Sequence, residues 1–274
     1  MNRFRSRRLV SSLVLAASLA LLLVAARTLE GSLRHTAVYS GALLLALLVV
    51  LTLFNARKKL PFLPLLKAST WMQIHIYLGL FCVALFLVHI EFRLPDGVFE
   101  ILLAAVFVIV TASGIFGLFV TRTLPPRITA SGESIVYERI PALRHQIQTE
   151  AEELVVRSEG ELQSSSLTDF YVDDVRPYLR HKTGVALAFG GGCRRQQRVE
   201  ERMKSIRRYL AEPELPVLDK LRELVDTKRN LDYQWSAQRL LKLWLFVHIP
   251  FTYSLLLFSV AHAIFALTYI GRLN

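Results

Sequence analysis

Five apolar blocks, each long enough to cross a bilayer, constrain this chain more than any other feature. Each lacks lysine and arginine, and they are Leu9–Ala26, Thr36–Phe54, Ile74–Ile90, Val98–Val120 and Leu243–Ile270. About 20 apolar residues in a helix span the hydrocarbon core of a membrane, and a helix in lipid satisfies its own backbone hydrogen bonds. The blocks therefore predict an all-α integral membrane protein with about five transmembrane helices.

The first block has a second interpretation. Arginines precede it at positions 3, 5, 7 and 8, and Val24-Ala25-Ala26 ends it, which also describes a secretory signal peptide. The apolar run is longer than a usual signal core, so we expect a retained helix, with cleavage as the alternative. The rest of the topology is the same in both cases.

The cations near the blocks predict the orientation of the chain, because cytoplasmic flanks carry an excess of lysine and arginine. With the N-terminus in the cytoplasm, the inner flanks hold nine cations: Arg3, Arg5, Arg7, Arg8, Arg57, Lys58, Lys59, Lys67 and Arg122. The outer flanks hold four: Arg27, Arg34, Arg93 and Arg272. The C-terminus is then outside a bacterial-type inner membrane. Much of the net charge of +11 follows from this topology and indicates contact with anionic lipid, with no nucleic acid as a partner.

The chain divides into three parts by sequence. Residues 1–122 carry helices one to four, residues 123–242 form a cytoplasmic insert, and residues 243–274 carry the fifth helix. Apolar residues recur in the insert at helical spacing, as in Ile140, Leu143, Ile147, Ala151 and Leu154. We expect a mainly helical insert, whose last helix continues unbroken into the fifth membrane helix. Only the stretch GVALAFGGGC, residues 184–193, resembles a strand and a turn.

Four of the seven histidines lie inside apolar blocks, where an imidazole is costly. His75 and His89 are 14 residues apart, and so are His248 and His262. In a helix, 14 residues turn through about 1400°, close to four full turns, and rise about 21 Å. Both histidines of a pair therefore face the same side of their helix, one near each membrane surface.

Topology then brings the two pairs to matching depths. Helices three and five both run outward, so His75 and His248 lie near the inner face and His89 and His262 near the outer face. Two imidazoles that face each other can supply both axial ligands of a b-type haem inside a helix bundle. We expect His75 and His248 to hold the iron of an inner haem, and His89 and His262 that of an outer haem. Packing histidines are the alternative.

Neighbouring residues repeat around the two helices. Trp71 and Trp244 each precede a histidine by four residues and suit the interfacial belt of a membrane protein. Small residues near the inner pair leave room for a macrocycle or another helix. These candidate cofactor-binding glycines are Gly79, Gly114 and Gly117.

The paired H-x13-H helices resemble those of di-haem membrane cytochromes b, a broad group that includes the transmembrane domain of ferric reductases. The resemblance covers helices three to five and implies that His75, His89, His248 and His262 are axial ligands of two non-covalent b haems. It implies electron transfer across the bilayer, as a subunit of an oxidoreductase complex. The implied partners are the quinone pool, with quinone a candidate second ligand, and other redox subunits such as a c-type cytochrome outside.

Two alternatives stay open on sequence alone. One is a haem-free membrane scaffold that recruits a partner through its cytoplasmic insert. The other is a stand-alone transmembrane reductase. We identify no catalytic residue, and an electron-transfer subunit fits the sequence better than a self-contained enzyme.

Overall fold

The computed structural model describes residues 36–59, 68–130, 135–162, 165–190 and 194–270, with a few positions between 15 and 24. The first predicted membrane segment, Leu9–Ala26, therefore lies largely outside the described residues, as do His35 and Cys193. Within the described ranges the chain is helical and contains no strand, which confirms the all-α prediction.

The described chain contains both long and short helices. The long helices are α2 (Thr36–Lys59), α3 (Ala68–His89), α4 (Val98–Ala130), α5 (Ile140–Leu162), α8 (Arg194–Ile206) and α9 (Leu215–Ile270). The short ones are η1 (Tyr137–Arg139), α6 (Ser165–Phe170), η2 (Tyr171–Val175), α7 (Arg176–Arg180), η3 (Val185–Phe189) and η4 (Glu212–Glu214). The 56 residues of α9 confirm the expected unbroken helix, which continues through Pro250.

Three described helices are long and apolar enough to cross a membrane. The candidate spans lie in Ser69–His89, Val98–Leu124 and the apolar part of Glu212–Thr268, and α2 holds a shorter apolar stretch, Ala37–Leu53. Large apolar side chains face outward on these helices, and a contiguous exposed apolar surface of this kind is typical of a membrane contact. Examples are Ile101, Leu102, Val108 and Ile115 on α4 and Phe246, Leu257 and Phe265 on α9.

The chain forms two compact units. The bundle unit comprises Met1–Leu118 and Trp244–Asn274, and the insert unit comprises Phe119–Leu243. Both α4 and α9 contribute residues to each unit. The boundaries expected from the sequence are 122/123 and 242/243.

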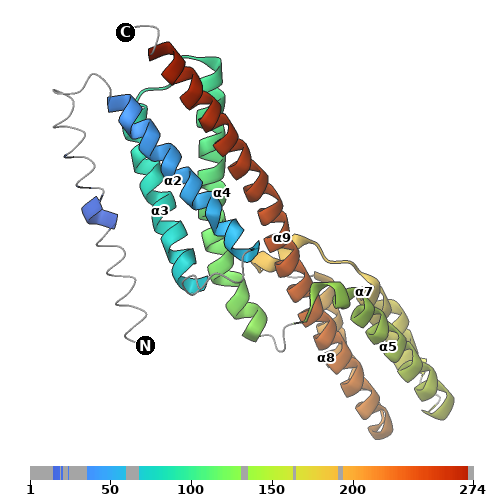
Figure 1. The fold of residues 1–274 in the computed structure, drawn as a ribbon. Helices are drawn as coiled ribbons and strands as arrows, with labels where there is room; N and C mark the ends of the chain where they lie inside the picture. Colours follow the sequence, from blue (N-terminus) through green and yellow to red (C-terminus); the bar gives the residue numbers. More distant parts are fainter. Residues whose placement is uncertain are drawn as a thin grey trace. The chain divides into compact units, whose positions relative to one another are not determined.

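Four helices share the core of the bundle unit (Figure 1). Its buried residues are Leu44 and Leu48 from α2, Cys82 and Leu85 from α3, Phe107 from α4 and Leu255 from α9. Phe86 and Phe107 stack beside it, with ring centroids 4.1 Å apart. On α3 and α9 this layer lies midway between the two histidines, so an apolar layer separates the two ends of the bundle.

The turn after α3 fixes where that helix ends. His89 is its last residue, and the next main-chain amides return to it: Glu91 donates to Val88 and Phe92 to Leu87, over 3.1 and 3.0 Å. This pattern is a Schellman motif. Glu91 and Phe92 adopt φ of 52° and 57°, a left-handed conformation that costs roughly 1–2 kcal/mol per non-glycine residue. The motif ends α3 and turns the chain toward α4.

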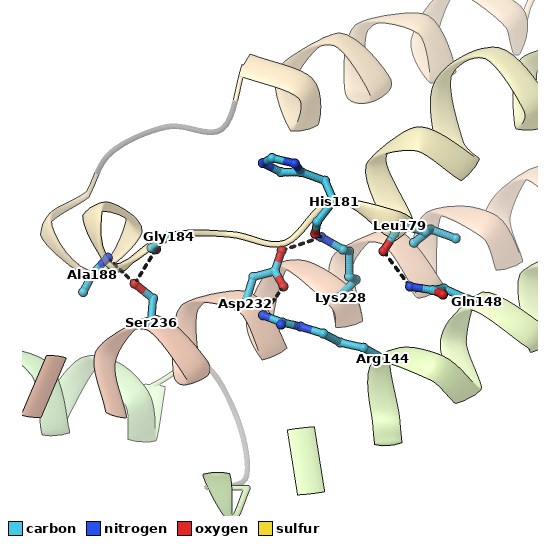
Figure 2. Close-up of polar contacts among 9 residues, drawn as sticks. All are labelled: Arg144, Gln148, Leu179, His181, Gly184, Ala188, Lys228, Asp232 and Ser236. Carbon is cyan, nitrogen blue, oxygen red and sulfur yellow. Dashed lines mark hydrogen bonds and ion pairs between the residues drawn. The ribbon is translucent and has the colours of Figure 1, made fainter. Parts of the chain in front are cut away.

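The stretch expected to resemble a strand folds differently. Val185–Phe189 forms the short helix η3, and Gly190, with φ of 86°, ends it. A side chain of α9 bonds this main chain: the single hydroxyl proton of Ser236 is shared between the carbonyls of Gly184 and Val185, each 3.0 Å away. The Ala188 amide donates back to the same hydroxyl over 3.0 Å (Figure 2). The strand interpretation was therefore wrong, because the main chain here bonds a helix side chain instead of a ladder.

A buried ion network crosses the insert unit (Figure 2). Asp232 bonds Lys228 over 2.5 Å and Arg144 over 2.6 Å, and the Asp232 and Lys228 side chains are only 4% and 1% exposed. Lys228 also donates to the His181 carbonyl over 3.2 Å and lies 4.3 Å from the centroid of the Tyr178 ring. One carboxylate thus compensates two cations from α5 and α9 and ties those helices together.

Replacing Asp232 with asparagine removes this charge at nearly constant volume. Lys228 and Arg144 then lose their shared anion, and we expect the free energy of unfolding to fall by about 3–5 kcal/mol. Asp219→Asn is the matched control, because the Arg207–Asp219 pair is 49% and 52% exposed and exposed pairs contribute about 1 kcal/mol or less. Unfolding of the full chain in detergent measures both variants, and equal losses would contradict this account of the network.

Candidate functional site

The structure brings the four membrane histidines together in two pairs within the bundle unit. His75 and His89 lie on α3 and His248 and His262 on α9, and each ring is partly buried. The rings of His89 and His262 face each other, with centroids 6.3 Å apart and planes at 85°. His75 and His248 are close enough to interact electrostatically. Because the same order holds on both helices, α3 and α9 run in parallel, and the partners are those that the equal spacing predicted.

The separation of His89 and His262 suits two ligands on one metal ion. A metal–imidazole bond is about 2 Å long, and the ring centre lies roughly 1 Å beyond the nitrogen, so opposed ligands have ring centres about 6 Å apart. The measured 6.3 Å is close to this value. Each imidazole plane contains its own metal–nitrogen bond, so a perpendicular pair of planes is compatible with this arrangement.

Residues of α2 and α4 surround the His89/His262 pair. The Ser40 hydroxyl of α2 lies 3.2 Å from His89 Nδ1, and the His89 ring also interacts with the main chain at Ala37. On the other side, the Phe99 ring lies over His262 at a centroid distance of 6.2 Å. Glu100, in the first turn of α4, brings a carboxylate oxygen to 4.0 Å from His262 Nδ1.

The His75/His248 pair has equivalent neighbours from the same helices. The Ser113 hydroxyl of α4 lies 2.6 Å from His248 Nδ1, and the His75 ring interacts with the main chain at Leu51 of α2. Trp244, one turn before His248, stacks on it at a centroid distance of 5.5 Å. The Trp244 indole nitrogen donates to the Ser113 carbonyl over 2.8 Å. Ser113 therefore positions two side chains of α9 at once.

The three predicted glycines have different neighbours. A Cβ at Gly79 would meet no described atom within 4 Å, and one at Gly114 would lie 3.7 Å from His248 Cε1. A Cβ at Gly117 would lie 1.9 Å from Trp244 Cζ2. Gly79 thus borders open space, and Gly114 faces the His248 ring. The lack of a side chain at Gly117 leaves room for the Trp244 indole.

Sequence reasoning missed five residues at this site: Ser40, Gly41, Phe99, Ser113 and Glu100. The histidine spacing says nothing about which other helices reach the rings. A usable signal was present, since Ser40, Ser113 and Glu100 are polar residues in apolar blocks, and such residues usually face a bundle interior. Both serines also precede a glycine.

The paired rings can be tested as holders of a haem. Among the described residues, no cluster of three or more His, Cys, Asp or Glu side chains could hold a metal ion by itself. A haem iron needs only two axial ligands from the protein, and each histidine pair can supply two. An unpaired donor lies nearby: the Trp71 indole nitrogen, one turn before His75, is shielded from solvent and has no partner among the described residues. An anionic group of a cofactor would satisfy it, so these residues fit a haem.

Comparisons of the chain with protein families, with curated proteins and with solved structures give no match.

Gly117→Ala tests the packing around Trp244. The new methyl group would overlap the indole, displace it and break its bond to Ser113, so we expect the free energy of unfolding to fall by about 1–3 kcal/mol. Gly160→Ala is the control, because a Cβ there meets no described atom within 4 Å. Thermal unfolding of both variants in detergent makes the comparison, and an unchanged Gly117→Ala protein would contradict the close contact.

Proposed function

We propose that this chain is a cytochrome b subunit that holds two b-type haems and carries electrons across a membrane. The observation that carries the proposal is the pairing of four imidazoles on two parallel helices, with one pair at 6.3 Å. His75 and His248 would hold one haem, and His89 and His262 the other. The haems, when bound, supply one-electron redox chemistry. The chain supplies position, axial nitrogen ligands and a water-poor surrounding.

The core of the bundle unit supports two separate sites. Between the histidine pairs, the buried side chains are all apolar, and they include Leu85 and Leu255, exposed by only 1% and 2%. Such a layer excludes water and keeps the local dielectric low, which tunes the redox potential of a bound haem. The rise between the two histidines of one helix, about 21 Å, sets one site near each membrane surface.

The topology belongs to the same proposal. Five membrane helices in a bacterial-type inner membrane would place the N-terminus and the insert in the cytoplasm and the C-terminus outside. The cation distribution supports this orientation. The insert unit then presents a docking or assembly surface in the cytoplasm. The quinone pool and an outer c-type cytochrome are the proposed redox partners, with membrane lipid around the bundle.

A reduced-minus-oxidised visible spectrum tests the proposal directly. Purified from cells with ample haem, the folded protein should show b-type bands and about two haems per chain by pyridine haemochrome. A folded but colourless protein would overturn the haem assignment, leave the histidines as packing residues and favour the scaffold alternative.

Single histidine substitutions test which rings share a haem. His89→Leu and His262→Leu should lose the same haem, and His75→Leu and His248→Leu the other, so each variant keeps about one haem per chain. His145→Leu is the control, because His145 is an exposed residue of α5 and its loss should leave both haems. Redox titration of the remaining haem identifies it, and a crosswise pattern of losses would overturn the parallel arrangement of α3 and α9.

A further inference from the structure

A Ser-Gly dipeptide contacts one histidine of each pair. Ser40-Gly41 on α2 contacts His89 of α3, and Ser113-Gly114 on α4 contacts His248 of α9. In both cases the serine hydroxyl lies at Nδ1 and the glycine faces Cε1 of the same ring. Two different helices thus present one local arrangement to two different imidazoles.

The hydroxyl bonds favour one ring nitrogen as the position of the proton. Ser40 Oγ donates to the Ala37 carbonyl over 3.1 Å, and Ser113 Oγ donates to the Val110 carbonyl over 2.9 Å. A hydroxyl has one proton and two lone pairs, and a carbonyl oxygen can only accept. With its proton committed to the carbonyl, each serine offers only a lone pair to Nδ1. In this arrangement the imidazole donates through Nδ1–H.

The glycines explain how a ring can lie against these helices. A Cβ at Gly41 would lie 2.8 Å from His89 Cε1, closer than side chains approach one another, whereas one at Gly114 would lie 3.7 Å from His248 Cε1. Gly41 is therefore required for the observed position of the His89 ring. Gly114 makes an ordinary contact and tolerates a methyl group.

We infer that the two Ser-Gly dipeptides are positioning residues that hold His89 and His248 as Nδ1–H tautomers and leave Nε2 of each ring free to bind iron. The iron-binding part rests on the proposed function, whereas the tautomers do not. A hydrogen bond from Nδ1–H to a serine oxygen fixes the ring orientation and raises the basicity of Nε2. Each haem would have one ligand of this kind, so each serine acts on one haem.

The tautomers can be measured in protein prepared without haem. Nitrogen-15 NMR of histidine-labelled full chain should show His89 and His248 protonated at Nδ1, with signals assigned by His89→Leu and His248→Leu. Ser40→Ala and Ser113→Ala should each alter only the signal of their own histidine. Ser→Thr, which keeps the hydroxyl, should restore it. Wild-type rings protonated at Nε2 would overturn the inference whether or not the protein binds haem.

The haem-loaded protein provides the second test. In a His262→Leu background, which retains only the His75/His248 haem, Ser113→Ala should weaken haem binding about 10- to 100-fold. It should also raise the midpoint potential, because a less basic ligand stabilises the ferric state less. Thr268→Val is the control: its hydroxyl bonds the Phe265 carbonyl in the same way, over 2.8 Å, on an exposed face of α9. An unchanged potential and affinity in Ser113→Ala would overturn the positioning role while leaving the haem assignment intact.

The glycines give a paired steric test of the same inference. Gly41→Ala should displace His89 and lower the occupancy of the His89/His262 haem, whereas the control Gly160→Ala, where a Cβ meets no described atom within 4 Å, should retain both haems. Pyridine haemochrome and redox titration of the full chain separate the two results. Equal haem retention in both variants would show that the ring does not lie against Gly41.

Discussion

An imidazole in an apolar helix must find a hydrogen-bond partner, and this requirement organises the bundle unit. Burying an unpaired polar group costs roughly 2–7 kcal/mol, depending on the reference state, so a membrane helix with two histidines needs other helices to satisfy them. Here α2 and α4 do so, through Ser40 at His89 and Ser113 at His248. The polar contacts therefore specify which helices adjoin α3 and α9, which apolar packing alone would not. In a membrane, a leucine side chain packs about equally well against any apolar helix or against lipid, so it does not select a neighbour.

The two histidine pairs are arranged in the same way on α3 and α9, but their neighbouring residues differ. The Ser113 hydroxyl lies at His248 Nδ1, and the Ser113 carbonyl accepts a hydrogen bond from the Trp244 indole. One residue of α4 therefore contacts both the tryptophan and the histidine of the Trp-x3-His sequence in α9. At the other pair, the Phe99 ring is the aromatic neighbour of His262, and Glu100 adds a carboxylate oxygen 4.0 Å from His262 Nδ1. A negative charge beside one pair and an indole beside the other make the two sites electrostatically unequal.

Periodicity and spacing predicted the part of the structure that depends on a single helix. The 14-residue spacing placed each histidine pair on one face, and the absence of a break before residue 243 predicted one long α9. What the sequence left undetermined depends on contacts between distant segments. The Ser40 and Ser113 contacts span 49 and 135 residues, and the stretch at Val185–Phe189 folds as η3 because Ser236, about 50 residues later, takes its main-chain groups. Local secondary-structure propensity cannot identify partners that lie so far away in the sequence.

The helix α9 shows two ways to bury polar groups in one continuous element. In the insert unit, the solution is ionic: Asp232 compensates Lys228 and Arg144 within a core of apolar side chains. In the bundle unit, where bare charges are far more costly, the helix carries two imidazoles: the Ser113 hydroxyl lies at His248, and the Glu100 carboxylate lies near His262. A full charge needs an opposite charge beside it, whereas an imidazole needs only one acceptor and keeps its second nitrogen available. The change from Asp and Lys to His along α9 thus leaves the membrane part of the helix with nitrogen lone pairs, the groups that a metal requires.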